Sequence, residues 1–179
     1  GIMSINKEIY DMANSNRDYS GMGTTFVAAV IAEGHVYIAN VGDSRLYYIG
    51  KDIQQITRDH PWLRIWLEWD FWRKKRQELI NKKNVITKAI GVAEDKTATP
   101  DIFEIEIDNG DKLLLCSDGL TNMVIDYDIN KIIRKSESIE DAVRTLINTA
   151  NENGGKDNIS AILISAEYTE NQDSLLSEQ

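Results

Sequence analysis

Four segments rich in apolar and β-branched residues follow one another between residues 24 and 57, with spacers of only two or three residues. Each spacer contains glycine beside a polar or charged residue, which is typical of tight turns. The segments cover Thr24–Ala32, His35–Val41, Arg45–Ile49 and Ile53–Thr57. Short strands joined by turns of this kind predict an antiparallel meander.

The second half of the chain predicts two more strands, then two helices, then a final strand. Apolar residues alternate over 102–107, the run 112–116 is apolar throughout, and 159–165 is the last strand segment. Helical spacing is found over 126–135 and over 138–151, where Ser138 is a suitable N-cap. A helix over 4–16, begun by Ser4, precedes the meander. Strands grouped apart from helices predict an α+β domain, an antiparallel β-sandwich flanked by helices.

Size and composition predict a single domain of ordinary globular type. The 179 residues are 42% hydrophobic and 27% charged, and the net charge of −9 argues against nucleic-acid binding. Cys116 is the only cysteine and lies in an apolar strand, which favours a reducing cytoplasm and a core role for its side chain. Since no apolar run approaches about 18 residues, no membrane span is expected. Residues 167–179 form a polar tail.

Three aspartates occupy similar places next to predicted strands. Asp43 follows Gly42, Asp118 precedes Gly119, and Asp157 precedes Asn158, so each carboxylate lies where the backbone turns. Carboxylate oxygens presented at a sheet edge are the ligands that Mg²⁺ and Mn²⁺ prefer. A single Asp beside Gly would indicate only a turn, but three together favour a metal site.

Six short sequence blocks carry a wider pattern in one order along the chain. They are Gly21–Thr25, Asn40–Arg45, Thr57–His60, Asn84–Gly91, Leu114–Leu120 and Lys156–Ser160. The chain resembles the metal-dependent protein serine/threonine phosphatases of type 2C, in their bacterial branch. The resemblance extends from Gly21 to about Ile164, which is most of the sequence.

This resemblance implies an αββα sandwich that hydrolyses phosphoserine and phosphothreonine in phosphoprotein substrates. It implies two or three Mn²⁺ or Mg²⁺ ions, with Asp118 and Asp157 ligating one and Asp43 sharing an additional ion with Asp118. Gly42, Ser44, Gly119 and Asn158 would support these ligands. The family's nucleophile is a metal-bound water, so no side chain is assigned as catalytic.

Family members also carry an upstream region with an acidic ligand, a phosphate-binding arginine and an Asp-Gly-x-Gly-Gly segment. Nothing before Gly21 corresponds to that region, so the domain, residues 1–166, is expected to be incomplete at its N-terminus. Two carboxylates serve a pair of hard ions poorly, so we expect weak activity from this chain alone. Uncovered apolar surface would favour a homo-oligomer or a domain swap.

The segment 62–80 differs from the family pattern because it is rich in tryptophan. All four tryptophans lie in it at helical spacing, and four consecutive basic residues follow the last one. They are Trp62, Trp66, Trp69 and Trp72. Such a helix can pack on this domain or on a copy of it, or it can bind a partner or a membrane surface. A non-catalytic scaffold that binds through this helix is therefore an alternative function, and another metal-assisted phosphoester hydrolase is a third.

Overall fold

The computed structural model describes residues 1–59, 88–93 and 98–167. Its elements are α1 (Ile2–Ser15), η1 (Arg17–Tyr19), β1 (Phe26–Ala32), β2 (His35–Val41), β3 (Arg45–Ile49), β4 (Ile53–Gln55), β5 (Asp101–Glu106), β6 (Lys112–Cys116), α3 (Asp118–Thr121), α4 (Asp126–Lys135), α5 (Ile139–Glu152) and β7 (Ala161–Ser165). The helices predicted over 126–135 and 138–151 are confirmed, and Ser138 caps α5 by accepting a hydrogen bond from the Asp141 N–H.

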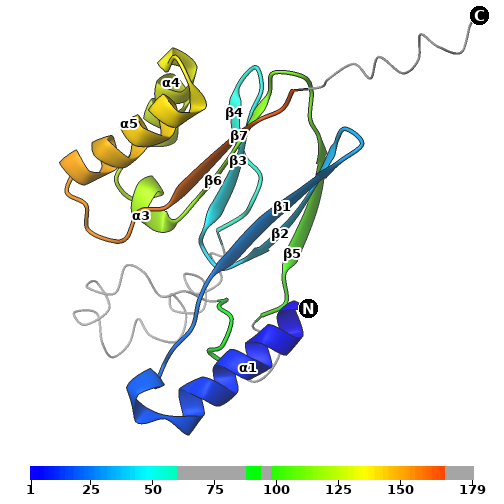
Figure 1. Ribbon diagram of the computed structural model, residues 1–179, viewed down its shortest axis with the longest axis vertical. Coiled ribbons are helices and arrows are strands. Elements are labelled where there is room, and N and C mark those ends of the chain that lie inside the picture. Colours follow the sequence, from blue (N-terminus) through cyan, green and yellow to red (C-terminus); the bar gives the residue numbers. More distant parts are fainter. Residues whose placement is uncertain (60–87, 94–97, 168–179) are drawn as a thin grey trace, which may run out of the picture.

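Two antiparallel sheets form the centre of the described structure. One has the order β1-β2-β5 and the other has the order β4-β3-β6-β7. Figure 1 shows α4 and α5 beside the second sheet, whereas α1 lies near the end of the first. The α+β class and the pair of antiparallel sheets predicted from the sequence are confirmed.

The single meander predicted over residues 24–57 is wrong at one connection. β1 pairs with β2 and β3 pairs with β4, but β2 and β3 belong to different sheets. The chain therefore crosses from one sheet to the other at residues 42–44. Turn residues report a change of direction, and the same Gly-Asp-Ser sequence is compatible with a hairpin or a crossing. Pairing with β6 instead determines where β3 lies.

The strand β6 divides its side chains between two hydrophobic layers. Leu113 and Leu115 face the first sheet and pack in one cluster with Val36 and Ile38 of β2. The alternate residues Leu114 and Cys116 belong to the cluster under the helices. Because successive side chains of a strand point to opposite faces, one five-residue apolar strand joins both cores.

The helical layer is held by the apolar sides of α4 and α5. The buried residues of this layer that form one hydrophobic cluster with strands of the second sheet are Leu120, Val124, Ile129, Ile133, Ala142, Leu146 and Ala150. Cys116 is buried among them, which confirms its predicted core role. Burial raises the pKa of its thiol to about 12.

Helix α1 is anchored by one buried polar residue, Asn6. Its side-chain amide donates to the carbonyl of Ala93 at 2.9 Å and accepts from the N–H of Gly91 at 2.8 Å. Gly91 has a φ of +90°, and an added Cβ would lie 2.2 Å from Ile9, so only glycine fits there. The predicted start at Ser4 is wrong, because the helix begins at Ile2 with Gly1 as its N-cap. Asn6, in the first turns of this helix, bonds to Gly91 and Ala93, and a local capping pattern does not encode such distant contacts.

Several predicted features lie outside the described residues. They are the helix over 62–80, its four tryptophans, and all of the polar tail except Glu167. None of the helices within the described ranges combines the length and apolar composition that spanning a bilayer requires.

We predict that Asn6→Ala lowers the free energy of unfolding by about 1–3 kcal/mol, because it removes the partner of the buried Gly91 N–H and of the partly buried Ala93 carbonyl. Urea unfolding followed by circular dichroism measures this change. Asn14→Ala on the same helix is the matched control, since its side chain is exposed and donates to the Tyr10 carbonyl of its own helix. Equal effects of the two substitutions would contradict the anchoring role.

We predict that Cys116 resists alkylation in the native protein. A thiol with a pKa of about 12 contains roughly a thousandfold less thiolate at neutral pH than one at the ordinary value of 9.0. Iodoacetamide labelling followed by mass spectrometry should show modification only in denaturing urea. Rapid labelling without urea would contradict burial in the helical layer.

Candidate metal centre

The crossing between the two sheets presents Asp43. Gly42 has a φ of +109°, and an added Cβ would lie 2.5 Å from the Thr25 methyl carbon, so the chain needs glycine to pass this point. Ser44, which is buried, shares a hydrogen bond of 2.9 Å between its Oγ and Thr25 Oγ1. These contacts fix the backbone on both sides of Asp43.

Asp118 lies where β6 ends and α3 begins. Its Oδ2 accepts a hydrogen bond of 3.0 Å from the side-chain amide of Asn122. The next residue, Gly119, approaches the loop before β7 so closely that an added Cβ would lie 2.2 Å from the Asn158 carbonyl oxygen. Any larger residue would separate the two loops.

Ser117 joins the Asp118 turn to the Asp157 turn. Its Oγ accepts from the Ser160 N–H at 3.0 Å and donates to the Asn158 carbonyl at 3.2 Å, while its own N–H donates to the Ser160 carbonyl. Asp157 is exposed, and its Oδ1 accepts from the Asn158 N–H at 2.7 Å. Asp118 and Asp157 thus lie on two backbone segments that are hydrogen-bonded to each other.

Asp43 and Asp118 interact electrostatically. Burial raises the pKa of the Asp43 carboxyl above its ordinary value, and the negative charge of Asp118 raises that pKa further. Two carboxylates that destabilise each other's charge are stabilised when a cation binds between them. Hard oxygen donors in this arrangement fit Mn²⁺ or Mg²⁺.

The three predicted ligands are not equivalent in the structure. Asp43 is linked to Asp118 by charge, and Asp118 is linked to Asp157 through the backbone of their two turns. Within residues 1–59, 88–93 and 98–167, no three His, Cys, Asp or Glu side chains gather closely enough to enclose a metal ion. Within the described residues the three aspartates therefore do not form a closed ligand cage.

A second polar group lies beside this site, and the sequence motifs do not predict it. Arg45 bonds to Asp59 and to Tyr47, and the Tyr47 hydroxyl donates to Asp126 at 2.9 Å. The sequence carries no spacing signal for it, because Tyr47 and Asp126 are 79 positions apart.

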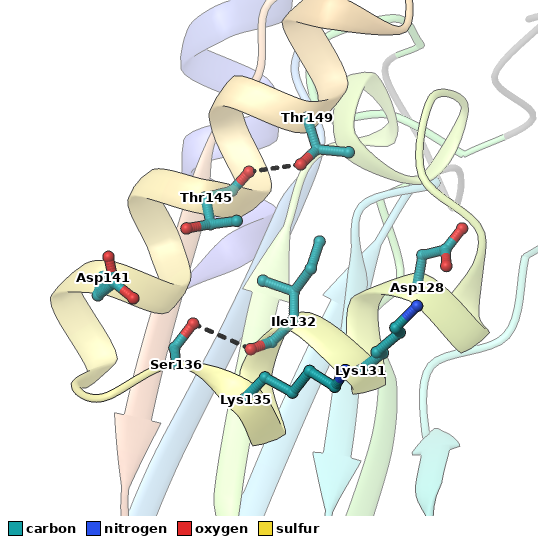
Figure 2. Close-up of a pocket in the computed structure, with 8 residues that line it drawn as sticks. All are labelled: Asp128, Lys131, Ile132, Lys135, Ser136, Asp141, Thr145 and Thr149. Carbon is teal, nitrogen blue, oxygen red and sulfur yellow. Dashed lines mark hydrogen bonds between the residues drawn. The ribbon is translucent and has the colours of Figure 1, made fainter.

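The described structure also has a pocket of about 400 Å³ between α4 and α5. Figure 2 shows its eight lining residues, which are Asp128, Lys131, Ile132, Lys135, Ser136, Asp141, Thr145 and Thr149. The Ser136 hydroxyl donates to the Ile132 carbonyl, and the Thr149 hydroxyl donates to the Thr145 carbonyl. None of the lining residues is one of the three aspartates, so this pocket is separate from the candidate metal centre.

The family model of protein phosphatase 2C matches residues 2–164. The chain belongs to the protein phosphatase 2C family. The match covers both sheets, helices α3 to α5 and all three aspartates.

Curated relatives of this phosphatase family confirm the assignment. The chain is 40% identical over 164 residues to the serine/threonine phosphatase stp of Listeria innocua, a match that covers 91% of this chain and 64% of the relative. It is 35% identical over 161 residues to the protein phosphatase PhpP of Streptococcus pneumoniae, covering 89% of this chain and 64% of that protein. The chain therefore spans less than two thirds of the length of these phosphatases.

Solved phosphatase structures share the fold. The serine/threonine phosphatase Stp1 of Staphylococcus aureus has a TM-score of 0.78 and 38% identity, covering 93% of this chain and 65% of that one. The catalytic domain of PstP, solved in complex with two manganese ions, has a TM-score of 0.70 and 28% identity, covering 88% of this chain and 65% of that one.

We predict that Gly119→Ala lowers the free energy of unfolding by about 2–4 kcal/mol, because its methyl group collides with a backbone oxygen that cannot move aside as a side chain does. Urea denaturation measures the effect. Gly110→Ala is the control, since its methyl group meets no atom within 4 Å and adds only the strain of a positive φ. A smaller loss for Gly119→Ala than for the control would contradict the close approach of the two turns.

Proposed function

We propose that this chain forms the metal-binding part of a serine/threonine phosphatase that acts on phosphoproteins with Mn²⁺ or Mg²⁺. The observation that supports this most directly is the bonded contact between the Asp118 and Asp157 turns, with Asp43 in electrostatic contact with Asp118. Membership of the protein phosphatase 2C family agrees with it. We assign residues 1–166 to this domain as part of the same proposal.

Each of the three aspartates would hold a hard cation with its carboxylate oxygens. Asp118 and Asp157 would share one ion, and Asp43 would share an additional ion with Asp118. Gly42 and Gly119 permit the close turns, Ser44 fixes the segment after Asp43, and the Asn158 N–H orients the Asp157 carboxylate. Bound divalent cations would neutralise phosphoryl charge and lower the pKa of water.

We also propose that the chain alone hydrolyses phosphoesters slowly. A hard divalent ion takes about six oxygen ligands, and the described residues supply three carboxylates that do not enclose one ion. Carboxylates without a cation repel each other, and the charge of Asp118 adds to burial in raising the pKa of Asp43. Weak ion binding would therefore limit the rate.

We further propose that the protein is cytoplasmic and that it self-associates. A cytoplasmic location agrees with the single, buried cysteine. Self-association agrees with exposed apolar side chains on the first sheet, where Val30 is 62% and Ile102 is 66% exposed.

Metal titration and turnover of a phosphothreonine peptide test the function. We expect Asp118→Asn and Asp157→Asn to raise the Mn²⁺ dissociation constant by about tenfold or more, because each removes an anionic ligand. Electron paramagnetic resonance of free Mn²⁺ measures binding, and phosphate release measures turnover, which EDTA should abolish. Asp52→Asn, in the exposed turn between β3 and β4, is the matched control and should change binding less than about twofold.

Two results would count against these proposals separately. Unchanged Mn²⁺ binding in both Asp118→Asn and Asp157→Asn would remove the metal site. Fast turnover by the unmodified chain would leave the phosphatase proposal intact and refute slow hydrolysis by the chain alone.

A further inference from the structure

Arg45 holds both carboxylate oxygens of Asp59. Its Nε donates to Asp59 Oδ1 at 2.9 Å, and its Nη2 donates to Oδ2 in a second, parallel bond. Gln55 adds a third donor to Asp59 Oδ1 at 3.0 Å. A two-point arginine–carboxylate contact is directional as well as charged, so Asp59 is turned toward Arg45 in a fixed orientation.

The same guanidinium also acts on a second carboxylate. Arg45 Nη1 donates to the Tyr47 hydroxyl at 2.8 Å, and that hydroxyl donates to Asp126 Oδ1 at 2.9 Å. Arg45 Nη1 also lies 4.0 Å from Asp126 Oδ1. Tyr47 is fully buried, so it fixes the direction of this contact. The Arg45 guanidinium therefore interacts with two carboxylates, those of Asp59 and Asp126, from different parts of the chain.

This group lies next to the proposed metal ligands. Arg45 is the second residue after Asp43, and in the sheet it pairs with Cys116, which is two residues before Asp118. Arg45 and Asp59 carry opposite charges, so together they form an ion pair that adds no net charge beside the site. Without Arg45, the Asp59 carboxylate would add one negative charge beside the Asp43 and Asp118 pair.

We infer that Arg45 is a positioning residue that keeps Asp59 out of the metal site and sets the charge that a divalent cation meets there. This inference rests on the proposed metal-dependent function and adds to it a residue outside the ligand set. The charge of the pair controls cation affinity in a defined direction. Loss of Arg45 strengthens Mn²⁺ binding, loss of Asp59 weakens it, and loss of both leaves it close to the unmodified value.

A double-mutant cycle on the full chain, with Mn²⁺ alone as the probe, tests the inference. One unit of charge acting on a divalent ion across about 10 Å of solvent changes its dissociation constant roughly fourfold. We expect Arg45→Met to lower the constant by about that factor, Asp59→Asn to raise it by a similar factor, and the double variant to lie within about twofold of the unmodified protein. Electron paramagnetic resonance provides the readout, independent of activity.

Two further variants separate charge from structure. Arg45→Lys retains the charge but can pair with Asp59 through a single ammonium group only, so its constant should lie between that of Arg45→Met and the unmodified value. Asp52→Asn removes the same charge as Asp59→Asn from a distant turn and should leave binding unchanged within about twofold. Circular dichroism identifies variants that do not fold. If Arg45→Met is one of them, Asp59→Asn decides the question, because Asp59 lies at the surface with a half-exposed side chain.

The variants test the role of Arg45 separately from the existence of the metal site. Weaker Mn²⁺ binding in Arg45→Met, or an unchanged constant in Asp59→Asn, overturns the role of Arg45 while Asp118→Asn still reports the metal site. Unchanged binding in Asp118→Asn and Asp157→Asn refutes the metal site and this inference together.

Discussion

The close approach of Gly119 to the Asn158 carbonyl is the contact on which the candidate site depends. It lets Ser117 bond to both Asn158 and Ser160, which extends the pairing of β6 and β7 beyond the strands themselves. Two turns that are remote in sequence thereby become one rigid surface. A backbone contact of this kind holds its position better than a contact between flexible side chains, so the carboxylates start from fixed points.

Burial in the two hydrophobic layers stabilises the fold against the repulsion between acidic residues at the candidate site. β6 contributes Leu113 and Leu115 to one layer and Leu114 and Cys116 to the other, and burial of one large aliphatic side chain stabilises the fold by roughly 1.5–3 kcal/mol. Acidic residues gathered at the end of this strand repel one another and act against folding. The site therefore lies at the end of the most thoroughly buried strand, where its backbone is held from both sides.

Charge is distributed around the site in two distinct ways. Burial raises the pKa of the Asp43 carboxyl and the charge of Asp118 raises that pKa further, so a cation bound between the two carboxylates would stabilise them. Asp59 and Asp126 are instead directed toward Arg45, one by a two-point ion pair and the other through Tyr47. Acidic side chains near the candidate site thus differ in their contacts with the Arg45 guanidinium.

The sequence by itself determined the helices α4 and α5, the strands β3 and β6, and the three aspartates with their glycine neighbours, because periodicity, capping and turn residues act over a few positions. It could not determine that β2 and β3 belong to different sheets, that Asn6 anchors α1, or that Tyr47 joins Arg45 to Asp126. Those features depend on partners as much as 87 positions away, and only packing of the whole chain brings such partners together. The tertiary structure also decided that the exposed turn of Asp157 lies beside the Asp118 turn, since the contact of Gly119 with Asn158, rather than any local signal, brings the two turns together.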